Sequence, residues 1–490
     1  MEHIKRIKTK HQIKLITMKK IILAVFSIML IVACKEEKKV EAFIDETTQE
    51  DIQPISDAVL ETAVIYEANI RQYSPSGHFD EFTKDIPQLK ELGVKVIWLM
   101  PIFPISETKR KATGGEDSKF ASDFPEAEQS KYLGSYYAVS DFTKINPEFG
   151  TLEDFRNLVK TAHENGIYVI LDWVPNHTGW DHTWIKSNPD YYTKDKDGNI
   201  THPVDTDWTD VADLNYDNKE MRKEMIADMQ YWLKEEGIDG FRCDVAGSVP
   251  TDFWVEAIPQ LRETKDIFML AEAWEPELAK ADLFDAVYGW DTHHVMNAMA
   301  KGEKDLNAWK ERLSQMDSLY EKDDIIMNFV TNHDENSWNG TINERMKDAA
   351  PLMTAFSYVI PGMPLIYSGM EYDMDHRLKF FEKDSIPKTK AKMWPLLEKL
   401  GKLKNTNPAL NGGKNPASYK NLETTNDKVL AFQRSKNNIT VSFVGNFSNK
   451  EQSFSAPLKG SFTDYMTNEP IEMNDNVLVL EPWEYRILTN

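Results

Sequence analysis

The sequence predicts an α/β protein: a (β/α)8 TIM barrel with a small loop-domain B after its third strand and a C-terminal antiparallel β-sandwich. Three observations support this fold class. Short apolar runs alternate with helical patterns over residues 64–367, two of the connections are unusually long, and helical periodicity stops beyond about residue 405. The length of 490 residues also suits a barrel of roughly 250 residues or more with a smaller domain attached.

Eight apolar runs are candidates for the strands of the barrel. Most are separated by amphipathic segments, such as residues 152–165. Repeated alternation of strand and helix favours a parallel sheet, although the count alone does not separate a barrel from a doubly wound sheet. The runs cover residues 64–69, 94–99, 167–172, 238–242, 267–270, 286–288, 325–330 and 363–367.

Two polar connections are too long to be simple turns. One covers about residues 106–132, and the other covers about 179–213, within a domain B that we place at 178–215. Loops of this length in a compact domain are usually functional or disordered, and in a barrel they lie over the carboxyl ends of the strands. Four tryptophans on or near the second loop have two readings of equal weight, sugar stacking and simple packing: Trp173, Trp180, Trp184 and Trp208.

Beyond residue 405 the pattern changes to short alternating strands. The runs 429–432, 439–444 and 477–480 are separated by turns that contain Asn, Asp and Gly. This pattern is typical of an antiparallel β-sandwich. We therefore assign residues 61–405 to the barrel and 406–490 to the sandwich.

The N-terminus predicts export. A basic start at residues 18–20 (MKK) precedes an apolar run at 21–31 and the sequence IVAC, which ends at Cys34. This order resembles a bacterial lipobox, so we assign residues 1–34 to a signal peptide, with Cys34 as the lipidated residue. Within this segment we expect translation to start at Met18. The alternative is a cleaved signal peptide in which the cysteine is incidental. The charged residues 35–60 then form a tether, and the outer membrane, on its periplasmic or outer face, is the expected location.

The composition restricts the partners. A net charge of −22 repels phosphate, which argues against nucleic acid and leaves a neutral ligand such as a sugar compatible. The body contains no apolar stretch of about 20 residues, so we expect contact with the membrane through the lipid alone. The oligomeric state stays open.

Polar side chains follow four of the predicted strands at the point where each strand ends. One such acid is ordinary, but carboxylates, an arginine and two histidines at several ends of one barrel converge on a single cleft. We therefore expect a site there. The segments are 172–177 (DWVPNH), 240–244 (GFRCD), 271–274 (AEAW) and 329–334 (FVTNHD).

These motifs resemble the α-amylase family, glycoside hydrolase family 13. The resemblance covers nearly all of residues 64–490, and every short motif of the family appears in order. It implies a retaining hydrolase of starch-derived glucans or maltodextrins that acts through a covalent glucosyl–Asp intermediate. The remaining motifs are 93–101 (GVKVIWLMP), 146–151 (NPEFGT), 213–215 (DLN) and 362–371 (GMPLIYSGME).

The resemblance assigns the catalytic roles. Asp244 is the nucleophile, Glu272 the general acid/base, and Asp334 a ligand of the sugar hydroxyls in the transition state. Arg242 is two residues before Asp244 on the same face of the strand, so we expect it to orient that carboxylate and lower its pKa. A retaining enzyme needs Asp244 and Glu272 about 5–5.5 Å apart. The other substrate-binding residues implied are Tyr137, His177 and His333.

The chemistry requires no cofactor, but the resemblance suggests a structural calcium ion. Its ligands map to Asn176 and Asp213. The family often has Lys-His after the nucleophile, whereas this chain has Gly247 and Ser248, which puts the calcium site in doubt. Cys243 alternates with the site residues along its strand, so we expect it in the core behind the barrel.

Several alternatives for the reaction stay open. The segment 244–249 (DVAGSV) is similar to members that act on cyclodextrins, pullulan and maltodextrins, and Val245 also leaves an α-1,6-glucosidase open. A transglycosylase would use the same fold, and a non-catalytic glycan-binding lipoprotein is the remote alternative. The loop at 106–132 either closes one end of the cleft and favours exo action or only decorates it.

Overall fold

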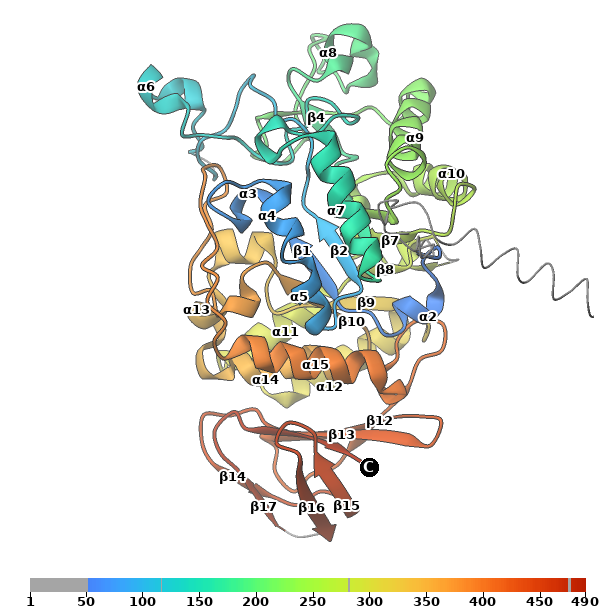
Figure 1. Ribbon diagram of the computed structural model, residues 1–490, viewed down its shortest axis with the longest axis vertical. Helices are drawn as coiled ribbons and strands as arrows, with labels where there is room; N and C mark the ends of the chain where they lie inside the picture. The colour runs from blue at the N-terminus through green and yellow to red at the C-terminus, as the bar shows by residue number, and fades with distance from the viewer. Residues whose placement is uncertain (1–51, 116, 281–282, 475–476) are drawn as a thin grey trace, which may run out of the picture. The chain divides into compact units, whose positions relative to one another are not determined.

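Eight parallel strands close into a barrel in the computed structural model (Figure 1). The structure describes residues 52–115, 117–280, 283–474 and 477–490, so the predicted signal peptide, the lipid site Cys34 and most of the tether lie outside the described residues. All eight predicted strands are present, and the predicted fold class is confirmed. In barrel order they are β1 (Ile65–Ala68), β10 (Met363–Tyr367), β9 (Ile325–Asn328), β8 (Ala286–Tyr288), β7 (Phe268–Ala271), β6 (Gly240–Cys243), β3 (Tyr168–Trp173) and β2 (Val96–Leu99).

Side chains along each strand alternate between the barrel interior and the helix layer. Ile65 of β1 belongs to the interior cluster with Val96 and Trp98, whereas its neighbour Tyr66 packs in the larger outer cluster. Cys243 is fully buried in that outer cluster, as expected. Because the interior is filled with side chains, a ligand site has to form at the strand ends.

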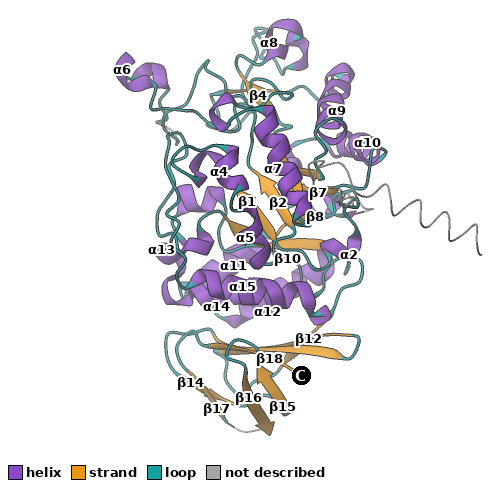
Figure 2. Ribbon diagram, in the orientation of Figure 1, coloured by secondary structure: helices purple, strands orange, loops and turns teal. Residues whose placement is uncertain are grey.

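Helices cover the outside of the barrel (Figure 2). Helix α7 (Leu152–Glu164) begins after Thr151 because the Thr151 hydroxyl and the Asp154 carboxylate cap it reciprocally. The helix buries Phe155 and Leu158. The α-helices are α2 (Asp57–Leu60), α3 (Ile70–Tyr73), α4 (Phe79–Thr83), α5 (Ile86–Glu91), α6 (Glu126–Gln129), α7 (Leu152–Glu164), α8 (Thr183–Ser187), α9 (Lys219–Lys234), α10 (Thr251–Arg262), α11 (Trp290–Ala300), α12 (Leu306–Leu319), α13 (Ile342–Met346), α14 (Ala350–Val359) and α15 (Met393–Thr406). Within the described part of the chain, none of these helices has both the length and the apolar character to cross a membrane.

The excursion after β3 is closed by a small antiparallel pair, β4 (His177–Gly179) and β5 (Val211–Asp213). Two of the four tryptophans near it pack rather than line a cavity: Trp173 is fully buried on β3 and Trp184 is buried against Tyr191. Trp180 is partly buried and lies under the Lys109 ammonium. Trp208 does line the cavity described below. The packing reading therefore holds for Trp173 and Trp184, and the stacking reading is left to Trp208.

Antiparallel strands form the C-terminal region. A six-stranded sheet has its own apolar core, which includes Val429, Val444 and Leu488. Arg434 ties this sheet to the barrel, because its guanidinium donates to the carbonyl oxygen of Val359 at 3.1 Å. The strands are β11 (Ser418–Leu422), β12 (Val429–Lys436), β13 (Ile439–Asn446), β14 (Gln452–Phe454), β15 (Lys459–Asp464), β16 (Glu469–Asn474), β17 (Leu478–Leu480) and β18 (Tyr485–Thr489).

Candidate active site

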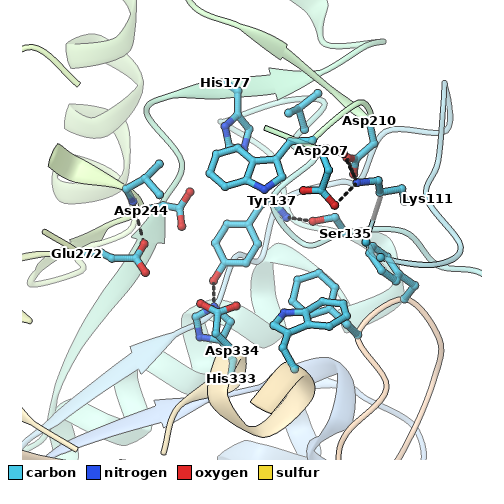
Figure 3. Close-up of a pocket in the computed structure, with 18 residues that line it drawn as sticks. Lys111, Ser135, Tyr137, His177, Asp207, Asp210, Asp244, Glu272, His333 and Asp334 are labelled. Atoms are coloured by element: carbon cyan, nitrogen blue, oxygen red, sulfur yellow. Dashed lines mark hydrogen bonds and ion pairs between the residues drawn. The ribbon is translucent and has the colours of Figure 1, made fainter. Parts of the chain in front are cut away.

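A cavity of about 380 Å³ lies at the carboxyl ends of the barrel strands (Figure 3). Asp244 follows β6, Glu272 follows β7, and His333 and Asp334 follow β9, so the barrel brings together residues that are far apart in the sequence. The predicted residues that line the cavity are Tyr137, His177, Asp244, Glu272, His333 and Asp334. The predicted Arg242 lies beneath them and is fully buried.

The Arg242 guanidinium joins three carboxylates. Nη1 donates to Asp172 Oδ1 at 2.7 Å and to Asp244 Oδ1 at 2.9 Å. Nη2 lies 2.7 Å from Glu272 Oε2 as an ion pair rather than an aligned hydrogen bond. Nε donates to the Tyr288 hydroxyl at 3.1 Å. One planar fork therefore contacts both Asp244 and Glu272, which lie next to each other in Figure 3.

The pKa of Asp244 corrects one expectation. Burial raises it well above its ordinary value, and the charges of Glu272 and Asp172 add to that effect, although Arg242 opposes it. Arg242 alone was expected to lower the pKa, but one cation cannot offset both dehydration and two neighbouring carboxylates. Burial likewise raises the pKa of Asp172 to about 6. Burial therefore opposes the charged forms of both Asp244 and Asp172.

Val245, directly after Asp244, has a left-handed backbone. Its φ is 37° and its ψ is 46°, which is costly for a β-branched residue. This conformation turns the Val245 backbone N–H toward Glu272, and it donates to Oε2 at 2.9 Å. The strained residue thus links the predicted nucleophile to the predicted acid.

A second buried network surrounds His333. Its Nε2 lies 2.8 Å from the Tyr137 hydroxyl, and its Nδ1 lies 2.6 Å from Glu67 Oε1. Burial lowers the pKa of His333, but the carboxylates of Asp334 and Glu67 outweigh burial and raise it to about 9. His333 is therefore a cation near neutral pH, whose Nδ1–H donates to Glu67 and whose Nε2–H faces Tyr137 and Asp334, the latter at 3.3 Å.

His177 differs from His333 in its charge. Burial lowers the pKa of His177 to about 3, and no neighbouring carboxylate raises it. Its ring lies 5.5 Å from that of Trp208. A neutral imidazole at this position can donate one hydrogen bond to a sugar hydroxyl without adding charge.

The two residues expected to hold calcium, Asn176 and Asp213, lie next to and within the β4–β5 pair. Asp213 pairs with His177 in the β4–β5 register, so it is close to Asn176. Calcium takes 6–8 oxygen ligands, and no group of three or more His, Cys, Asp or Glu residues suited to a metal exists in the described ranges. At Gly247, where the family often has lysine, the carboxylate of Glu275 occupies the space in which a side chain would begin. We therefore derive no step through a metal.

Sequence reasoning missed several residues of the site. Glu67 had a signal, since it is an acid inside the apolar run 64–69. Lys111, Asp207 and Asp210 also line the cavity, together with Trp338, Phe380 and Phe381. Trp338 lies in the short helical segment Glu335–Asn339 and the others lie in loops. None belongs to a strand-end motif, so only the folded chain could identify them.

A family profile described as "Alpha amylase, catalytic domain" matches residues 41–402. A second profile, described as "Beta-galactosidase C-terminal domain", matches residues 429–490. The two matches fall on the barrel and on the C-terminal strands.

Individual proteins are also similar. Alpha-amylase 3 from Dictyoglomus thermophilum is 28% identical over 354 residues, which make up 64% of this chain and 64% of that protein. A 4-alpha-glucanotransferase from Thermotoga neapolitana is 30% identical over 342 residues, or 61% of this chain and 68% of that protein. The crystal structure of an alpha-amylase from Lactobacillus plantarum has 29% identity and a TM-score of 0.76, and the match covers 88% of this chain and 100% of that chain. The chain therefore spans less than two thirds of the length of the first of these curated relatives.

Proposed function

Because this chain belongs to the alpha-amylase family, whose catalytic-domain profile matches residues 41–402, we propose that it is a retaining glycoside hydrolase. It cleaves α-glucosidic bonds, mainly α-1,4, in starch-derived glucans or maltodextrins. The observation that carries this proposal is the single guanidinium of Arg242, which holds Asp244 Oδ1 at 2.9 Å and Glu272 Oε2 at 2.7 Å. Two carboxyl groups held side by side in a cavity suit a double-displacement reaction.

In the first step an oxygen of Asp244 attacks the anomeric carbon of a bound glucosyl unit. Glu272 gives its proton to the glycosidic oxygen, which leaves with the rest of the chain, and a glucosyl–Asp244 ester forms. In the second step Glu272 removes a proton from water, which attacks the same carbon and frees Asp244. Arg242, which contacts Asp244, and the Val245 N–H, which donates to Glu272, hold the two carboxyl groups in place for these steps.

The test replaces each member of the pair. Asp244→Asn removes the nucleophile and Glu272→Gln removes the proton, so each is expected to reduce the release of reducing sugar from maltoheptaose by several orders of magnitude. Asp197→Asn, at an exposed turn, is the matched control and should keep the wild-type rate. An unchanged rate in Asp244→Asn would refute the proposal.

Transglycosylation is a second candidate reaction. A sugar acceptor competes with water for the covalent intermediate, and the exposed Trp274, with 53% of its surface accessible, offers an aromatic face two residues beyond Glu272. The relative named 4-alpha-glucanotransferase favours it as well. Chromatography of products from maltotriose separates the reactions, because longer or rearranged products indicate transfer. Isomaltose and pullulan in the same assay test α-1,6 cleavage.

We also propose that the enzyme is an exported lipoprotein, anchored at the outer membrane through a lipid on Cys34. The order of basic start, apolar run and IVAC sequence supports this. Metabolic labelling with an alkyne fatty acid should mark the wild-type protein and not Cys34→Ala. Equal labelling of both proteins would contradict the anchor.

A further inference from the structure

We infer that the first part of the loop at residues 106–132, from Glu107 to Gly114, ends the substrate site on its non-reducing side, so that the enzyme takes α-glucan chain ends rather than internal segments. This inference rests on the proposed hydrolase function and adds the form of substrate that it accepts. It is carried by the way the loop is fixed across the cavity, and by the side of the cavity on which it lies.

One side of the loop is fixed to the excursion after β3. Lys111 is 4% exposed, and its Nζ lies 3.7 Å from Asp210 Oδ1 and 3.9 Å from Asp207 Oδ2. It also donates to the backbone carbonyl of Asp207 at 2.5 Å. A buried ammonium that contacts two carboxylates and a carbonyl keeps the loop at one position. If the loop moved, the buried Asp210 carboxylate would lose its cationic partner.

The base of the loop adds further contacts with the same excursion. The backbone N–H groups of Glu107 and Thr108 both donate to Asp181 Oδ2, at 2.8 and 3.1 Å. The Lys109 ammonium lies 3.5 Å from the centre of the Trp180 ring. Backbone, charge and aromatic contacts therefore hold the two long connections together.

The opposite side of the loop meets the segments that follow β9 and β10. A Cβ atom placed on Gly114 would lie 2.9 Å from the Trp338 ring, so the backbone of the loop tip touches that ring. The N–H of Leu133 donates to the carbonyl of Phe381 at 2.7 Å. The part of the loop around Lys111 and Gly114 thus contacts two walls of the cavity.

The positions of Asp244 and Glu272 determine which side of the substrate the loop faces. Glu272 faces the glycosidic oxygen of the leaving part, so the reducing side of the substrate leaves past Glu272. With these roles, the non-reducing side of a substrate points away from Glu272. In Figure 3, Lys111, Asp207 and Asp210 lie on the side of the cavity opposite Asp244 and Glu272. The loop therefore meets the non-reducing side of the bound sugar.

The size and chemistry of the closed end agree with a chain terminus. The cavity of about 380 Å³ is near the lower end of the roughly 300–1,000 Å³ of pockets that enclose small molecules. The Asp207 side chain is 42% exposed, so its carboxylate can accept hydrogen bonds from the hydroxyls of a terminal glucose. An internal segment has no free 4-hydroxyl there and would need space that the loop occupies.

The test uses the wild-type enzyme and two substrates. One is p-nitrophenyl α-maltoheptaoside, and the other is the same compound with a 4,6-O-ethylidene group on its non-reducing glucose, with products read by chromatography. Cleavage of the free compound at least 100-fold faster (roughly 2.7 kcal/mol) is expected. Equal cleavage would overturn the chain-end inference and leave the hydrolase intact. Cleavage of neither would overturn the hydrolase, and the inference with it.

A pair of variants locates the closure. Lys111→Ala should free the loop and raise the rate on the blocked compound relative to the free one at least tenfold. Lys119→Ala, an exposed lysine of the same loop, should leave that ratio at the wild-type value. Circular dichroism at 222 nm verifies that both variants fold. A folded Lys111→Ala enzyme with an unchanged ratio would overturn the role of Lys111 in the closure.

Discussion

The two ends of the cavity are both built around a buried cation, but the chain makes them in different ways. At the catalytic end, Arg242 contacts three carboxylates at 2.7–2.9 Å. At the far end, Lys111 lies 3.7 and 3.9 Å from Asp210 and Asp207. Arginine presents a rigid planar fork and lysine a flexible point charge, so the first arrangement fixes geometry and the second mainly compensates charge.

The elements that carry the two ends differ in the same sense. Arg242, Asp244 and Glu272 are placed by β6 and β7, whose register is set by the barrel, with Arg242 opposite Leu270. Lys111 and Asp210 are placed by loops that hold each other. Strands therefore fix the groups that break the bond, and loops select the substrate.

The largest expected effect follows from breaking the catalytic end. Arg242→Lys cannot contact three carboxylates at once, and loss of such fixed electrostatic contacts costs roughly 10²–10³ in kcat. Steady-state kinetics on maltoheptaose measures the loss. Arg377→Lys, in an ion pair with Glu344 that is 47% exposed on each side, is the control and should remain near the wild-type rate. Comparable kcat values for Arg242→Lys and wild type would show that the fork is not required.

Breaking the far end should affect stability first. Lys111→Met leaves Asp210 buried and unpaired, which costs about 3 kcal/mol in the free energy of unfolding. The double variant Lys111→Met/Asp210→Asn should regain part of that loss, because no buried charge remains. Urea unfolding of the three proteins measures both values. A single variant as stable as wild type would mean that water already compensates Asp210.

A smaller effect concerns pH and the network beneath the catalytic end. The pKa of His333 is raised to about 9, so the stabilisation from its proton is complete below pH about 6.5 and is lost as pH rises through about 9. In Glu67→Gln one anionic partner is gone, so the loss should be smaller and occur at lower pH. Urea midpoints measured from pH 6 to 10 compare the two proteins. Superimposable pH profiles would contradict the assigned partner.

The smallest effect is expected from removal of calcium. Asn176 and Asp213 supply two side-chain donors, well short of the 6–8 oxygen ligands that the ion takes. EDTA and added calcium should therefore change the Tm by no more than about 1 °C, equivalent to roughly 1 kcal/mol for a chain of this size. A rise of several degrees with calcium would restore the site at the excursion after β3.

The fold and the catalytic end were open to sequence reasoning because their signals are local. Apolar runs predicted all eight barrel strands, and the strand ends predicted Asp244, Glu272 and Asp334 at one cavity. Glu67 went unassigned, although its place inside an apolar strand was a visible signal. The direction of the pKa shift of Asp244 was wrong, since it depends on total burial and on all neighbouring charges, which no spacing records.

The sequence by itself determined which residues stand at the strand ends, because the period of a strand and the direction of a parallel barrel leave them only one face to occupy. Only the tertiary structure decided that Lys111 meets Asp207 and Asp210 and that Gly114 touches Trp338. Residues about 100 or more positions apart in loops meet through packing and charge compensation, and neither leaves a period in the chain.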